Sequence, residues 1–188
     1  MFVLWILYCV VHSLLADVSV KSFIQKITGK WFRYYRITYS LFAFITLAAI
    51  LYYQFSISSS LLFVSSLKYF VGAILILPGL YIMAVCIKKY FYELSGIQAL
   101  ENKIQTNTLQ QTGLHKLVRH PLYFGTLLFV WGLFLFFPFV SNLIACLVIH
   151  AYVIFGVSLE EKKLLLEYGD AYKQYALKVP RLFPHLKI

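Results

Sequence analysis

Five side chains suited to acid–base or ion-binding chemistry border one long uncharged stretch of the sequence. Arg119, His120 and Tyr123 stand at its start, and Glu160 and Glu161 follow its end. A guanidinium can hold a carboxylate through two parallel hydrogen bonds, and imidazole, phenol and carboxylate groups can bind or move protons. The same residues could also be ordinary charges that flank two membrane helices. They form a site only if the fold brings the two ends together.

The stretch between these residues predicts the required fold. Residues 122–159 number 38 and include no Lys, Arg, Asp or Glu. One straight helix of that length would measure about 57 Å, nearly twice the roughly 30 Å of a hydrocarbon core. Pro138 lies near the middle, and proline breaks or kinks a helix. We therefore expect a helical hairpin whose two ends share one membrane surface.

The composition requires lipid as the solvent for much of the chain. Hydrophobic residues make up 61% of the sequence and charged residues 13%, too apolar a balance for an ordinary soluble domain. The expected fold class is all-α, a polytopic membrane protein with about five transmembrane helices, the last two forming the tight hairpin. The predicted spans are residues 2–16, 37–56, 69–87, 122–137 and 139–159. The first is interpreted as a span, since it lacks the basic start and the cleavage pattern of a signal peptide.

Basic residues predict the orientation. They follow the first, third and fifth spans, and only Lys68 falls on the other side. Because cytoplasmic loops are enriched in Lys and Arg, we expect an integral membrane protein with its N-terminus outside. The C-terminal segment and the candidate site would then be cytoplasmic. The net charge of +10 is interpreted as a topology signal and an attraction to anionic membrane lipids, and no nucleic-acid partner is expected.

Two further segments and the cysteines complete the prediction. Residues 20–36 mix apolar and basic positions at a helical spacing, which predicts an interfacial helix that either anchors the chain at the membrane surface or lines a substrate entrance. Residues 88–118 form the one long polar stretch, which favours a functional role. The three cysteines lie in apolar runs without a CxxC pair, so neither a disulfide nor a metal site is expected. No repeat or linker divides the chain, so residues 1–188 are expected to form one domain.

The motifs around the hairpin resemble a known family. Gly-Leu-His-Lys-Leu-Val-Arg-His-Pro-Leu-Tyr-Phe-Gly at 113–125 precedes the glutamate pair, and Tyr-Gly-Asp-Ala-Tyr at 168–172 and Val-Pro-Arg at 179–181 follow it. This order resembles the isoprenylcysteine carboxyl methyltransferase superfamily of integral membrane methyltransferases. The N-terminal half, with His-Ser-Leu-Leu-Ala at 12–16, resembles the bacterial branch of methanethiol S-methyltransferases and NnrU-like proteins, which implies a location in a bacterial inner membrane.

The resemblance implies a methyl transfer from S-adenosylmethionine to an acceptor that arrives from the membrane. Residues 1–87 would then form three N-terminal spans, and residues 88–188 would form the cofactor-binding half. Arg119 and Glu160 are the expected catalytic residues, and Gln98 and Glu161 are expected to contact the acceptor. The expected cofactor contacts are Asn107, Thr108, Leu109, Gln110, His115, His120, Pro121, Leu122, Tyr123 and Glu160.

One departure from the family pattern bears on the acceptor. An arginine that the prenylcysteine enzymes carry about one turn before the glutamate pair is Gly156 here. We therefore favour S-methylation of a small thiol over methylation of a prenylcysteine carboxylate or a phospholipid amine. A non-catalytic membrane protein that binds haem or lipid is the other alternative, with His12 and His150 as a conceivable haem pair. Packing and an acceptor-site role are the other interpretations of these two histidines.

Overall fold

The computed structural model describes residues 1–95 and 108–184, and within these ranges the chain is helical, with one isolated β-bridge between Leu61 and Phe139. The predicted all-α class is confirmed. The elements in chain order are α1 (Phe2–Ala16), α2 (Val18–Thr28), the 3-10 helix η1 (Gly29–Tyr34), α3 (Tyr35–Ser56), α4 (Leu67–Ser95), the 3-10 helix η2 (Gly113–Lys116), α6 (Pro121–Phe136) and α7 (Val140–Lys178).

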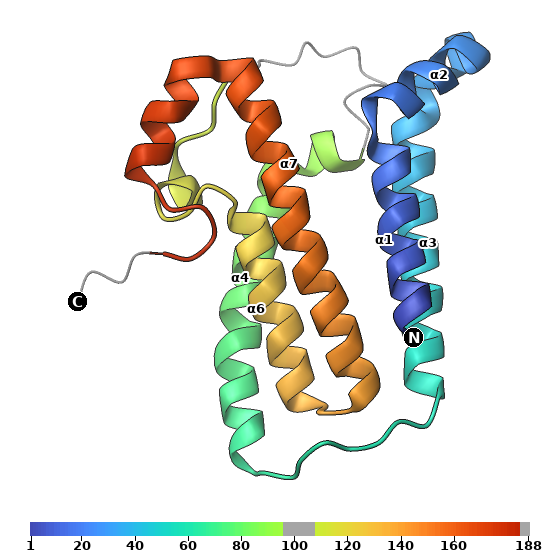
Figure 1. Ribbon diagram of the computed structural model, residues 1–188, viewed down its shortest axis with the longest axis vertical. Helices are drawn as coiled ribbons and strands as arrows, with labels where there is room; N and C mark the ends of the chain where they lie inside the picture. The colour runs from blue at the N-terminus through green and yellow to red at the C-terminus, as the bar shows by residue number, and fades with distance from the viewer. Residues whose placement is uncertain (96–107, 185–188) are drawn as a thin grey trace.

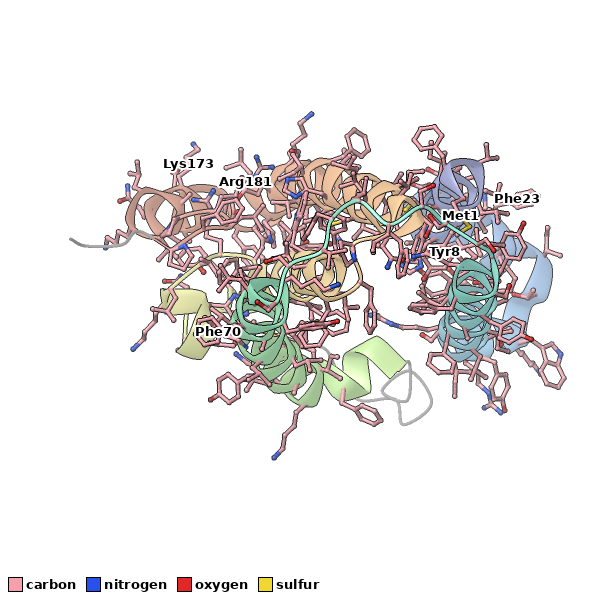
Figure 2. The ribbon with its side chains drawn as sticks, turned by 90° about the horizontal axis from the view of Figure 1, so that it is seen from below. Met1, Tyr8, Phe23, Phe70, Lys173 and Arg181 are labelled. Carbon is pink, nitrogen blue, oxygen red and sulfur yellow. The ribbon has the colours of Figure 1, made fainter. Side chains whose placement is uncertain are left out.

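The long helices run alternately up and down one bundle (Figure 1). The connections 57–66 and 137–139 lie together at one end, where Leu62 donates a backbone hydrogen bond to Pro138 at 2.8 Å. The segments that hold most of the basic residues lie at the opposite end. Viewed along the bundle in Figure 2, α6 and α7 stand between α4 and the pair formed by α1 and α3. The basic segments thus lie at one end of the bundle, as the positions of Lys and Arg in the sequence predict.

Length and apolar composition make three helical segments able to cross a membrane, among the residues that the structure describes. They are Val18–Ser56, Leu67–Phe91 and Val140–Lys178, and α1 and α6 are shorter apolar helices. Phe23 of α2 and Phe70 of α4 project outward from the bundle, as expected of side chains that contact lipid (Figure 2). The chain is thus a membrane protein, while the count of five spans stays a prediction.

Glycines allow α4 and α6 to pack backbone against backbone. Gly72 and Gly79 of α4 are seven residues apart, as are Gly125 and Gly132 of α6, so each pair lies on one helix face. A β carbon at Gly79 would lie 2.9 Å from the carbonyl oxygen of Gly125, and one at Gly132 would lie 2.9 Å from that of Gly72. Small residues allow such close approach between membrane helices. This contact fixes α6, whose first turn carries part of the candidate site.

Gly169 reverses the direction of α7. Its backbone has φ 53° and ψ −125°, a conformation that other residues rarely adopt. Residues 170–178 therefore leave the axis of residues 140–168 and fold back toward the start of α6 (Figure 1). The reversal brings the Tyr172 ring and the Ala176 carbonyl group to Arg119, and it brings the Tyr175 hydroxyl to the carbonyl oxygen of His115. The expected C-terminal segment thus packs on the candidate site.

Candidate active site

The two ends of the hairpin meet at the basic end of the bundle. α6 and α7 are joined by residues 137–139, and Pro138 is fully buried in that turn. Backbone bonds hold the start of α6 against the C-terminal segment, because the amide of Arg119 donates to Pro180 at 2.9 Å and that of His120 to Arg181 at 3.2 Å. The five side chains that border the uncharged stretch therefore share one rim, which we define as Arg119, His120, Tyr123, Glu160 and Glu161.

Arg119 is bound to groups of its own chain. Its Nε and Nη2 donate to Oε1 of Glu161 at 2.8 and 2.6 Å, and its Nη1 donates to the carbonyl oxygens of Ala176 and Val179 at 2.8 and 2.9 Å. The guanidinium carbon also lies 5.9 Å from the centre of the Tyr172 ring. Since the side chain is only 11% exposed, Arg119 ties α7 and its returning segment to the start of α6.

His120 stands between the two glutamates. Its Nε2 lies 3.2 Å from Oε1 of Glu161, and its Nδ1 lies 3.7 Å from Oε2 of Glu160. The imidazole is buried, with 3% of the side chain exposed. Burial lowers the pKa of His120, although both carboxylates oppose that shift. The ring is therefore neutral at neutral pH, and its one N–H is best placed on Nε2, which is the ring nitrogen within hydrogen-bond distance of a carboxylate, that of Glu161.

The two glutamates have different surroundings. Glu161 is 21% exposed and is bound by Arg119, His120 and Arg181, whose Nε lies 3.3 Å from Oε2. Burial raises the pKa of the Glu161 carboxyl, but the hydrogen bonds and charge of Arg119 outweigh it, so the net shift is downward. Glu160 is 42% exposed and shares a hydrogen bond with the Tyr123 hydroxyl. Glu161 is thus an internal charge, whereas Glu160 has a carboxylate available to a ligand.

The first turn of α6 adds backbone donors beside Glu160. Pro121 occupies the first helical position, and the His120 side chain makes no capping hydrogen bond. Amides in the first turn of a helix have no partner within the helix, so those of Leu122 and Tyr123 are not satisfied by α6 itself. Such amides favour an anionic group. The rim therefore offers one carboxylate and two amides to a ligand that carries both a positive and a negative group.

His115 connects the polar stretch to the rest of the site. Its Nδ1 lies 3.1 Å from the carbonyl oxygen of Arg119, and its Nε2 lies 2.7 Å from the Tyr90 hydroxyl. Burial lowers the pKa of His115, so the ring is neutral, Nδ1 carries the hydrogen and Nε2 accepts from Tyr90. Burial also raises the pKa of Tyr175 to about 12, and its hydroxyl donates to the His115 carbonyl at 2.6 Å.

The remaining predicted contacts lie in or near the polar stretch. The Gln110 side chain accepts from Lys89 at 2.9 Å and lies 3.4 Å from the Thr108 hydroxyl, which attaches this segment to α4. Leu109 is partly buried and lies between Thr108 and Gln110 in the sequence. Gln98 and Asn107 lie outside the described residues. The roles of all these residues stay predictions.

Some contacts in the site were not predicted from the sequence. Arg181, Tyr172 and Tyr175 all contact the rim or its supports, and Tyr90 orients His115. The first three lie in the motifs Val-Pro-Arg and Tyr-Gly-Asp-Ala-Tyr or directly after them. Their position in or near those motifs could have indicated that they belong to the site. Nothing in the sequence around Tyr90 indicates such a role.

Comparison with known families agrees with this geometry. The family model described as phospholipid methyltransferase matches residues 67–171, more than half of the chain and all of the rim. The chain belongs to this family. The predicted resemblance to membrane methyltransferases is therefore confirmed. No solved structure matches the chain.

Similar curated proteins are methyltransferases with two kinds of acceptor in their names. Methanethiol S-methyltransferase of Pseudomonas deceptionensis is 34% identical over 116 residues, covering 58% of this chain and 42% of that protein. Methanethiol S-methyltransferase 1 of Bradyrhizobium diazoefficiens is 28% identical over 198 residues, covering 95% and 64%. Protein-S-isoprenylcysteine O-methyltransferase of Schizosaccharomyces pombe is 31% identical over 111 residues, covering 53% and 46%. The chain thus spans less than two thirds of each relative.

Proposed function

We propose that the chain is an S-adenosylmethionine-dependent membrane methyltransferase that methylates a small thiol. The observation that carries the proposal is the rim, where the accessible Glu160 carboxylate stands beside the buried His120 and the free amides of α6. Family membership and the names of the similar proteins support the reaction class. We further propose that residues 1–188 act as one unit whose rim faces the cytoplasm of a bacterial cell.

The rim fits the amino-acid end of the cofactor. S-adenosylmethionine supplies a methyl group on a positively charged sulfur, and its amino-acid end carries an ammonium and a carboxylate. Glu160 would bind a cationic group, while the amides of Leu122 and Tyr123 would bind the carboxylate. Thr108, Leu109, Gln110 and His115, together with Asn107, would face the adenosine side. Methyl transfer needs orientation of the two reactants more than covalent help, and a rim held in place by internal hydrogen bonds is suited to that.

Arg119 and Glu161 have a positioning role in this proposal. Their mutual hydrogen bonds, and those from Arg119 to Ala176 and Val179, hold His120 and Glu160 in place. A catalytic contact for Arg119 and an acceptor contact for Glu161, as expected from the family, would require these bonds to rearrange. We therefore assign direct ligand contact to Glu160 first, since its carboxylate is the most exposed of the charged groups in the rim.

The surroundings of Gly156 favour a neutral acceptor. A β carbon at this position would meet no atom within 4 Å, so packing around the β carbon does not require the glycine that stands in place of an arginine. A small thiol needs no cationic clamp, unlike a prenylcysteine carboxylate. Methylation of a phospholipid amine is the second candidate, because the matching family model is described as a phospholipid methyltransferase.

A transfer assay with an acceptor panel tests the proposal. Purified protein is incubated with methyl-labelled S-adenosylmethionine and, separately, with a short alkyl thiol, a prenylcysteine analogue and a phospholipid amine. We expect label in the alkyl thioether. Glu160→Gln should abolish transfer, and the exposed Glu167→Gln on the same helix serves as the matched control. Transfer that survives in Glu160→Gln would refute the site. A Soret band in the purified protein, with no transfer, would favour haem binding instead.

A further inference from the structure

An apolar groove of about 270 Å³ lies along the seam between α1 and α3. Leu7, Phe42 and Ala43 are among its apolar lining residues, and Leu7 and Phe42 are about half exposed. Figure 2 shows Tyr8, another lining residue, at this seam. The groove runs within the part of the bundle that faces lipid, so an occupant can enter it from the membrane.

The end of the groove nearer the rim is polar. His12 and Tyr39 line it, and the Tyr39 hydroxyl lies 3.0 Å from the ring nitrogens of His12. The Tyr152 ring of α7 lies 6.5 Å from the His12 ring, and its hydroxyl accepts a hydrogen bond from Ser13 at 3.0 Å. Three helices thus contribute an imidazole and two phenols to one cluster inside an apolar bundle. Polar groups at such a depth are costly and commonly mark functional sites.

The cluster lies on the path from the groove to the rim. Tyr152 precedes Glu160 by eight residues of α7, about 12 Å along the helix axis. Tyr123 lies in this interval, because its hydroxyl is hydrogen-bonded to Glu160 and it stands near Tyr39 and Tyr152. The polar end of the groove therefore faces the side of the bundle where the rim stands.

We infer that this groove binds the methyl acceptor as a small neutral thiol, with its alkyl group beside Leu7, Phe42 and Ala43 and its S–H group at His12 and Tyr39. The inference rests on the proposed function and names the acceptor site that the rim alone does not provide. The volume falls just below the roughly 300–1,000 Å³ of most small-molecule pockets, which favours a small acceptor over a prenyl or diacyl chain.

The cluster also supplies a proton acceptor. A neutral thiol in lipid reacts poorly, because the thiolate is the nucleophile. In the proposed step the acceptor S–H bond breaks and the proton moves to a ring nitrogen of His12, while the sulfur electron pair forms the new S–CH₃ bond. The methyl donor's C–S bond breaks, and its electron pair returns to the donor sulfur. The Tyr39 hydroxyl orients the His12 ring, and Tyr152 lies on the side of the cluster nearer to Tyr123.

Photolabelling tests the groove without requiring turnover. The probe is a short alkyl thiol that carries a diazirine, and labelled peptides are mapped by mass spectrometry. We expect label on peptides of α1 and α3 that an unlabelled alkyl thiol competes away. Ala43→Leu fills the groove and should weaken labelling about tenfold, whereas Ala48→Leu, on the same helix but outside the groove, should not. Equal labelling of both variants, or label confined to other helices, would overturn the inference.

Binding and transfer measured on the same samples separate the two proposals. His12→Gln should keep thiol labelling and S-adenosylmethionine binding but lose transfer about 100-fold at neutral pH, with partial recovery as alkaline pH ionises the thiol. An unchanged rate in His12→Gln would remove the proton-acceptor role. Specific labelling of the groove in a wild-type protein that binds no S-adenosylmethionine would refute the proposed function and leave the groove as a thiol site.

Discussion

Substitution of the two adjacent glutamates should separate stability from cofactor binding. In Glu161→Gln the neutral amide cannot balance Arg119, which donates two hydrogen bonds to Oε1 of Glu161 at 2.8 and 2.6 Å. Both side chains are mostly buried, at 11% and 21% exposed. Hydrogen bonds to charged groups contribute about 1.5–3 kcal/mol, and one half of a buried ion pair left alone costs about 3–5 kcal/mol. Partial exposure reduces this, so we expect a loss of about 2–4 kcal/mol.

Glu160→Gln should have the opposite profile. Its carboxylate is 42% exposed and lies 3.7 Å from the neutral His120 ring, so removing its charge should change the free energy of unfolding by no more than about 1 kcal/mol, the upper end for exposed ion pairs. Thermal unfolding of the detergent-solubilised variants, followed by circular dichroism, measures their stability. Calorimetric titration with S-adenosylmethionine measures their cofactor binding. We expect Glu160→Gln to unfold near the wild-type temperature and to lose binding. Equal destabilisation by the two substitutions, or intact binding in Glu160→Gln, would refute the assignment of their roles.

Three further predictions follow from the same structure. Gly79→Ala should destabilise the protein by about 1–3 kcal/mol in thermal unfolding, since its β carbon would lie 2.8 Å from the Phe129 amide nitrogen, while Gly156→Ala, with no atom within 4 Å, should not. Gly169→Ala should cost about 1–3 kcal/mol because of its positive φ, and limited proteolysis should then cut the returning segment faster. Burial lowers the pKa of His120 below that of an unfolded histidine, about 6.5. The contribution of this histidine to the free energy of unfolding is therefore present above that pH and lost as the pH falls. His120→Gln should flatten the dependence of stability on pH in this range.

The hairpin and the membership of the rim were predictable from the sequence. Residues 122–159 are too long and too uncharged for one span, and Pro138 supplies the turn, so Arg119 and Glu160 had to lie near each other. The all-helical class followed from composition for the same reason. These features depend on the length and the hydrophobicity of a segment, and both can be read directly from the sequence.

The partners of the rim residues were not predictable. The reversal at Gly169 depends on one backbone conformation, and a glycine between Tyr168 and Asp170 is equally compatible with a continuing helix. Without that reversal, nothing indicates that Arg119 binds the carbonyl oxygens of Ala176 and Val179. The seven-residue spacing of the glycines in α4 and α6 did carry a signal for close helix packing, but only the structure shows which helices meet.

The most direct test of the central claim is to locate the bound cofactor. Ultraviolet crosslinking of methyl-labelled S-adenosylmethionine to the purified protein, followed by peptide mapping, reports which residues surround it. We expect label on the peptides that contain His120–Tyr123 or Glu160, and its loss in Glu160→Gln but not in Glu167→Gln. Label at the opposite end of the bundle, in residues 57–66 or 137–139, would contradict the account.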